Sequence, residues 1–121
     1  RCIMNSKLFK EKLIEQVSKK DIVLASTVEI TDKCNFKCPH CYVEKKSFNN
    51  KNMDFDVFLR FISEFKKQGG LYLILTGGEA ILHPEFDRFF ITAKKMGFII
   101  SVFSNGFIVD SKIELFKKYR P

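Results

Sequence analysis

The chain has 121 residues, 45% of them hydrophobic, which fits one globular domain and excludes two. Its longest apolar runs are far shorter than the ~18 to 20 residues of a membrane span, and no secretory signal is visible, so we expect a cytoplasmic protein that contacts no membrane. The net charge of +7 favours acidic partners, but paired lysines fall at predicted helix ends, where they offset the helix dipole. Nucleic acid is therefore not the expected partner.

The first half of the chain predicts a helix, a strand and a second helix. Residues 6–19 carry apolar side chains at helical spacing, with Lys and Glu elsewhere, which indicates a short amphipathic helix. Residues 22–30 are rich in β-branched and apolar types and predict the first strand. After a polar, turn-prone stretch, Asp54 is the expected cap of a helix that ends at Gly69–Gly70.

The second half continues the alternation of strands and helices. The unbroken apolar run 71–75 predicts a parallel strand buried on both faces. His83–Pro84 is expected to begin the next helix, with Pro at its first position, and Gly97 is expected to end it. A third strand is predicted at 98–103, and the capping box Ser111–Glu114 predicts the start of a last helix.

This alternation indicates an α/β protein whose parallel strands are joined by right-handed crossovers, in an open sheet or in part of a barrel. Because each barrel unit takes about 30 residues, 22–121 holds about three units and cannot close a barrel. We expect 1–21 to be an N-terminal helical extension and 22–121 to be the N-terminal part of a longer or naturally truncated protein. The open edges of a three-stranded sheet could join copies into an oligomer.

Three of the four cysteines gather in CNFKCPHCY, directly after the first predicted strand. Cys34, Cys38 and Cys41 could hold three irons of a cubane cluster, and the missing fourth ligand would leave one iron open to a small molecule. Structural zinc needs four ligands, so a zinc site would take one more from His40, His83 or Cys2. In a reducing compartment this grouping points to metal rather than disulfides, and the spacing favours the iron-sulfur cluster over zinc.

Two glycine-bearing turns follow the other predicted strands: Gly77, Gly78 and Glu79 after the second, and Ser104, Asn105 and Gly106 after the third. Ligands of parallel α/β sheets bind beyond the carboxyl ends of the strands, so all three loops are expected to face one side. Paired glycines let the backbone approach a ligand closely, and Glu79 offers a carboxylate to an ammonium group. Each turn alone also has an ordinary explanation, as a tight connection or a loop with positive φ.

These motifs resemble those of the radical S-adenosylmethionine (SAM) superfamily, whose signatures are CxxxCxxC after the first strand and GGE after the second. The resemblance covers roughly residues 22–121. The motif sequences CNFKCPHCY, LTGGEAILHPEF and SNG are similar to those of the branch whose members often carry a C-terminal SPASM domain and modify peptides or proteins. Two positions depart from the usual pattern: Ala80, where the family often has Pro, and His40, where an aromatic residue is frequent.

The resemblance implies a partial (β/α) TIM barrel that binds a 4Fe-4S cluster and SAM. The implied metal ligands are Cys34, Cys38 and Cys41. The turn of Gly77, Gly78 and Glu79 would hold the methionine amino group. The residues expected near the nucleoside, the cluster or the adenine are Ser104, Asn105, His40 and Tyr42.

The implied function is that of a radical enzyme, in which one electron cleaves SAM and the resulting 5′-deoxyadenosyl radical abstracts hydrogen from the substrate. A peptide or protein is the expected substrate, and a flavodoxin-type or ferredoxin-type protein is the expected reductant. The 121 residues alone are not expected to turn over. Two alternatives remain: a non-catalytic module that keeps a cluster or zinc for a partner, and a zinc-stabilised nucleic-acid binder.

Overall fold

The computed structural model describes residues 6–20, 22–41 and 51–121. The strands are β1 (Ala25–Thr31), β2 (Tyr72–Gly77) and β3 (Ile99–Val102). The α-helices are α1 (Ser6–Lys20), α2 (Phe55–Lys67), α3 (Phe86–Lys95) and α4 (Ile113–Lys118). Two short 3₁₀ helices, η2 (Ala80–Leu82) and η3 (Val109–Lys112), precede α3 and α4.

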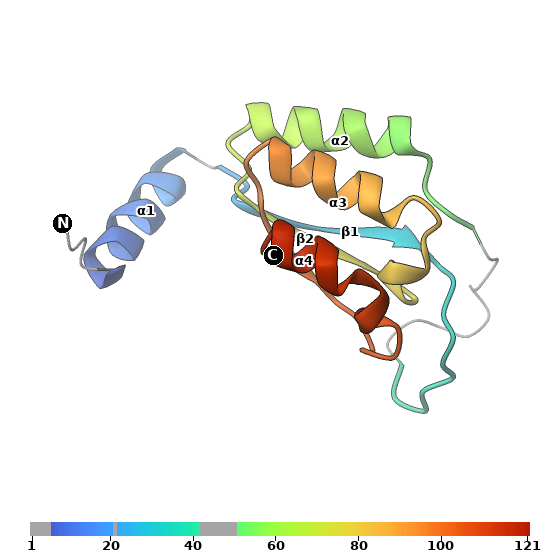
Figure 1. Cartoon of the computed structure of the whole chain (residues 1–121). Helices are drawn as coiled ribbons and strands as arrows, with labels where there is room; N and C mark the ends of the chain where they lie inside the picture. The colour runs from blue at the N-terminus through green and yellow to red at the C-terminus, as the bar shows by residue number, and fades with distance from the viewer. Residues whose placement is uncertain (1–5, 21, 42–50) are drawn as a thin grey trace.

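The strands form one parallel sheet in the order β1-β2-β3, in which Thr27 pairs with Ile74 and Ile74 pairs with Ser101. The helices α2, α3 and α4 lie on the same side of this sheet, whereas α1 extends away from it (Figure 1). A parallel strand needs a crossover of at least a helix's length to reach its neighbour, which is why each strand is followed by a helix. The predicted α/β fold, a helix followed by three parallel strand-helix units, is confirmed, and it is the arrangement of a partial TIM barrel.

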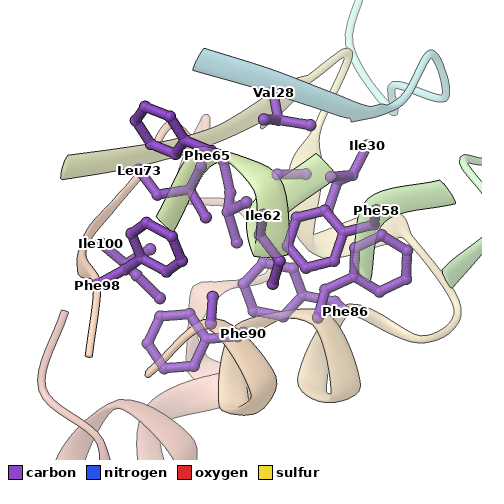
Figure 2. Packing of buried hydrophobic residues seen from close by; sticks show 14 of the residues in the cluster. Val28, Ile30, Phe58, Ile62, Phe65, Leu73, Phe86, Phe90, Phe98 and Ile100 are labelled. Carbon is purple, nitrogen blue, oxygen red and sulfur yellow. The ribbon is translucent and has the colours of Figure 1, made fainter. Parts of the chain in front are cut away.

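The hydrophobic core lies between the sheet and the helices, and phenylalanines dominate it (Figure 2). Phe58 of α2 and Phe89 of α3 are both fully buried, with ring centroids 4.4 Å apart. The strands contribute alternate residues, such as Leu73 and Leu75, because successive side chains of a strand point to opposite faces. Burying each such side chain contributes about 1.5 to 3 kcal/mol, so this layer supplies most of the stability.

The other face of the sheet is largely uncovered in the part of the chain that the structure describes, although Thr76 near its carboxyl end is buried. Tyr72 and Ile99, which pair with each other across β2 and β3, are 38% and 45% exposed there. The expectation that the run 71–75 is buried on both faces is therefore wrong for the described residues. Leu73 and Leu75 meet the helices, whereas Tyr72 lies on the uncovered side, which in a closed barrel is the interior.

Two predicted helix starts are also wrong. The helix expected from His83–Pro84 begins at Phe86, because Nδ1 of His83 accepts the Glu85 N–H (3.0 Å) and holds the segment in a turn. Ser111 does not cap α4, since its hydroxyl donates to the Ile108 carbonyl oxygen (2.7 Å) within η3. In contrast, Asp54 does occupy the N-cap position of α2, although its side chain makes no capping hydrogen bond.

The lysines lie where the charge pattern predicted, since α1, α2, α3 and α4 each carry two in their last turn. Their positive charges offset the negative ends of the helix dipoles, and this effect explains their positions without a nucleic-acid partner. The apolar face of α1 is only partly covered: Leu13 is half-buried, whereas Ile14 is exposed. Within the described ranges, no helix has the length and hydrophobicity that crossing a bilayer requires.

Candidate functional site

The three loops singled out in the sequence lie at the same end of the sheet, beyond the carboxyl ends of the strands (Figure 1). We call residues 32–41 the cysteine loop, residues 77–79 the GGE turn and residues 104–107 the SNG loop. Each follows one strand of a parallel sheet, so the topology alone brings them together. The contacts between them are hydrogen bonds and one aromatic pair.

The cysteine loop presents three free thiols. Cys34 is half-buried, whereas Cys38 and Cys41 are exposed. The Cys41 N–H donates to the Cys38 carbonyl oxygen (3.3 Å), and the Phe36 N–H donates to Sγ of Cys34 (3.4 Å). In the part of the chain that the structure describes, no three His, Cys, Asp or Glu side chains converge as metal ligands. The loop therefore carries three free thiols, two of them exposed, that do not converge on one point in the described structure.

The GGE turn holds the beginning of the cysteine loop. The Gly78 N–H donates to the Thr31 carbonyl oxygen (2.9 Å), and the Glu79 N–H donates to the Lys33 carbonyl oxygen (2.7 Å). On the other side, the Thr31 hydroxyl donates to Oδ1 of Asn52 (2.7 Å). These bonds fix the chain directly before Cys34, so the first thiol leaves the sheet from a defined position.

The two glycines allow this close approach. Gly77 has φ +156°, and a Cβ there would overlap the Thr31 carbonyl oxygen. At Gly78 a Cβ would overlap the Lys33 carbonyl oxygen and lie 2.7 Å from that of Asp32. The neighbouring backbone of residues 31–33 therefore requires glycine at both positions, whether or not a ligand also approaches the turn.

Glu79 joins the GGE turn to the SNG loop. Its side chain is only 1% exposed, and its two carboxylate oxygens accept different backbone N–H groups. Oε1 accepts from Ile81 (3.2 Å), and Oε2 accepts from Asn105 (2.7 Å). A buried charge of this kind is tolerated because charge-assisted hydrogen bonds replace its hydration. The carboxylate is therefore engaged inside the protein.

The remaining predicted residues lie at the surface or outside the described ranges. Ser104 is exposed, and its Oγ accepts the Gly106 N–H (3.0 Å). His40 is exposed beside Cys41. Tyr42 lies outside the residues that the structure describes.

His83 is unsuited to the zinc alternative. It is buried, its Nε2 lies 3.0 Å from the Met53 carbonyl oxygen, and its Nδ1 accepts the Glu85 N–H. The acceptor role of Nδ1 assigns the ring proton to Nε2, so one nitrogen holds the start of α3 and the other binds the segment before α2. A fourth zinc ligand would have to come from another residue.

Three residues of the site were not predicted from the sequence. Nδ2 of Asn105 donates to Oδ1 of Asn35 (2.8 Å), and the rings of Phe36 and Phe107 meet edge to face with centroids 5.5 Å apart. Asn35 and Phe36 lie between the first two cysteines, and Phe107 follows the SNG motif. The only available signal was their position inside or beside recognised motifs.

Residues 28–121 match the radical SAM superfamily. The chain belongs to this superfamily. Its members are enzymes that use a 4Fe-4S cluster and SAM, as the sequence predicted. The donor set fits that cluster, because three free thiols are available on one loop and a backbone N–H is already directed at the sulfur of Cys34.

Curated relatives of this radical SAM chain are similar over short regions. A tungsten-containing aldehyde ferredoxin oxidoreductase cofactor-modifying protein of Pyrococcus furiosus is 31% identical over 71% of the chain and 25% of that protein. The antilisterial bacteriocin subtilosin biosynthesis protein AlbA of Bacillus subtilis is 30% identical over 80% of the chain and 22% of that protein. An S-adenosylmethionine-dependent nucleotide dehydratase of a Thermoplasmatales archaeon is 33% identical over 70% and 30%. The chain thus spans about a quarter of these relatives' lengths, and the predicted likeness to modifying enzymes of this superfamily is confirmed.

Proposed function

We propose that residues 22–121 form the cluster-binding and SAM-binding part of a radical enzyme that modifies a peptide or protein. The observation that carries the proposal is a loop of three free thiols, braced by the GGE turn and the SNG loop, in a chain of the radical SAM superfamily. When bound, a 4Fe-4S cluster supplies the electron that cleaves SAM to the 5′-deoxyadenosyl radical.

In this proposal Cys34, Cys38 and Cys41 are the cluster ligands, and the missing fourth protein ligand leaves room for SAM. The GGE turn binds the methionine amino group. Because the Glu79 carboxylate already accepts two backbone N–H groups, main-chain oxygens of the turn are the acceptors that we assign to this amino group.

The other assigned residues lie around the cofactors. Ser104 and Asn105 bind near the nucleoside. His40 and Tyr42 lie against the cluster and the adenine, where they exclude water. The assignment is supported by the position of the SNG loop beside the cysteine loop, which the bond between Asn105 and Asn35 maintains.

We assign substrate binding to the uncovered face of the sheet at its carboxyl end. The central row of this face, Thr27, Ile74 and Ser101, combines hydroxyl groups with an apolar side chain. A peptide substrate is supported by the motif sequences and by the relative named for bacteriocin biosynthesis. The net charge of +7 favours an acidic flavodoxin-type or ferredoxin-type electron donor.

The test is anaerobic reconstitution of the full-length protein with iron and sulfide. We expect about four iron and four sulfide per chain, and release of 5′-deoxyadenosine from SAM after reduction. The Cys2→Ala variant, which lacks a thiol outside the loop, should behave as the wild type. Tight binding of one zinc without iron or sulfide would contradict the proposal, and a cluster that never cleaves SAM would favour a non-catalytic module.

The substrate class is tested separately with deuterated candidates. A peptide encoded beside the gene should transfer deuterium to 5′-deoxyadenosine, whereas nucleotides should not. Transfer from a nucleotide alone would leave the radical chemistry intact but overturn the assigned substrate.

A further inference from the structure

The cysteine loop and the SNG loop touch at two points that lie close together in both loops: the contact residues are neighbours in the first loop and are separated by Gly106 in the second. Oδ1 of Asn35 accepts the Asn105 side-chain N–H (2.8 Å), and the next residue, Phe36, packs its ring against Phe107. The two contacts differ in chemistry, one polar and one aromatic. Together they restrain the short segment between Cys34 and Cys38 in both position and rotation.

Asn105 is also held in place by two further hydrogen bonds. Its backbone N–H donates to the buried carboxylate of Glu79 (2.7 Å), and its Oδ1 accepts the Phe107 N–H (3.0 Å). These two bonds fix the backbone and the amide plane, so that Nδ2 faces Asn35. The bond between the two asparagines therefore starts from an anchored donor, unlike a typical contact between exposed side chains.

The restrained segment also makes the hydrogen bond to the first thiol. The peptide that joins Asn35 to Phe36 carries the N–H that donates to Sγ of Cys34 (3.4 Å). Hydrogen bonds to cysteine sulfur are one of the factors that set the reduction potential of an iron-sulfur cluster. Any movement of Asn35 would move this N–H relative to the sulfur.

We propose that Asn105 and Asn35 are a pair of positioning residues, through which the SNG loop holds the N–H···S bond at Cys34 and links the SAM side of the site to the cluster potential. The inference rests on the proposed function. Neither side chain needs to touch the cluster. The pair acts through the Asn35–Phe36 peptide, and Glu79 anchors it from the buried side.

The test uses the reconstituted full-length protein with Asn35→Ala, Asn105→Ala and the double variant. SAM affinity is measured by anaerobic equilibrium dialysis, and the midpoint potential of the cluster by redox titration. Each single variant should shift the potential to lower values and weaken SAM binding. The double variant should bind SAM no more weakly than Asn105→Ala. The fold-loss of SAM affinity in the double variant should therefore be smaller than the product of the two single fold-losses, by a factor of about two or more.

Asn35→Asp and Ser111→Ala are the matched controls. Asn35→Asp keeps the acceptor for Asn105, so its SAM affinity should stay within about twofold of the wild type. Ser111→Ala removes an exposed bond to the Ile108 carbonyl oxygen that does not reach the cysteine loop, and should move neither readout.

The outcomes separate the inference from the function. An unchanged potential and unchanged SAM affinity in Asn35→Ala, or fully additive effects in the double variant, would overturn the positioning role. If Asn35→Ala loses the cluster while Asn35→Asp keeps it, the acceptor is essential and the inference stands. A wild-type protein that takes up no cluster would overturn the proposed function, and the inference with it.

Discussion

The helix-facing side of the sheet and its carboxyl end are held together by different forces. On the helix-facing side, buried phenylalanines such as Phe58 and Phe89 fill the space between strands and helices. At the carboxyl end, the connections among the loops are few: backbone bonds from the GGE turn, the Glu79 carboxylate, one pair of asparagines and the edge-to-face pair of Phe36 and Phe107. The first region is therefore the source of stability, and the second determines geometry.

Phenylalanine itself illustrates the difference. Phe58 is fully buried in the core, whereas Phe107 is 71% exposed in the SNG loop. The same side chain thus contributes burial in one region and only an edge-to-face contact with Phe36 in the other. Substitutions of buried groups should consequently reduce stability, whereas substitutions of exposed groups at the carboxyl end should alter cofactor binding.

Removal of one thiol should have the largest effect at the carboxyl end and almost none on the core. Cys38→Ala should abolish the iron and sulfide content after reconstitution, because two remaining thiols cannot hold three irons. The thiol is exposed, so the melting temperature of the unloaded protein should change by less than about 2 °C. Iron analysis and thermal unfolding monitored by circular dichroism measure the two effects, and a large loss of stability would contradict the separation of the regions.

The opposite behaviour is expected in the core. Phe58→Ala should lower the free energy of unfolding by about 3 to 5 kcal/mol, through lost burial and the cavity left between α2 and α3. Phe61, on the same helix, is 40% exposed and stacks only on the edge of the core at Phe65. Phe61→Ala should therefore cost about 1 kcal/mol. Equal losses in urea unfolding of the two variants would refute the burial argument.

Gly77 lies where the two regions meet, because it ends β2 and begins the GGE turn. Gly77→Ala should cost about 2 to 4 kcal/mol, because the new Cβ would overlap the Thr31 carbonyl oxygen at an already unfavourable φ. Gly106 also has a positive φ, +82°, but open space surrounds its missing Cβ. Gly106→Ala should cost only about 1 to 2 kcal/mol. The difference between the two, measured by urea unfolding, isolates the steric contact.

The regular elements could be predicted from the sequence because their signals are local. The apolar spacing of 55–67 and the unbroken run 71–75 identify α2 and β2 without knowledge of any other segment. The start of α3 could not be predicted in this way. It depends on the His83 ring, which accepts the Glu85 N–H and also lies against the Met53 carbonyl oxygen, 30 residues earlier in the chain. Neither contact can be recognised from the Pro84 signal alone.

The site could be predicted from the sequence only where its arrangement follows from the strand order. Parallel strands place their carboxyl ends at one edge, so the three loops were expected to face one side before any contact was known. The contact between Asn35 and Asn105 joins residues 70 positions apart and leaves no local pattern. The burial of Glu79 was equally hidden, since a carboxylate after two glycines is compatible with both an exposed ligand and an internal anchor.

A substitution at Glu79 should have a smaller effect on stability than those at Phe58 and Gly77. Glu79→Gln keeps the shape of the side chain but replaces one acceptor oxygen with an NH₂ group, which would face a backbone N–H of Ile81 or Asn105. One buried donor would lose its partner, so the free energy of unfolding should fall by about 1 to 2 kcal/mol.

Glu114→Gln is the matched control for this substitution. Glu114 is paired with Lys117 at 2.8 Å, but its side chain is 85% exposed, so the change to Gln should leave stability within about 0.5 kcal/mol of the wild type. Urea unfolding compares the two variants directly. If Glu79→Gln weakened SAM binding without any loss of stability, its carboxylate would be a ligand group held ready for the cofactor. A loss of stability in Glu79→Gln alone means that the carboxylate is part of the fold, and that buried anchoring extends from the core into the carboxyl-end loops.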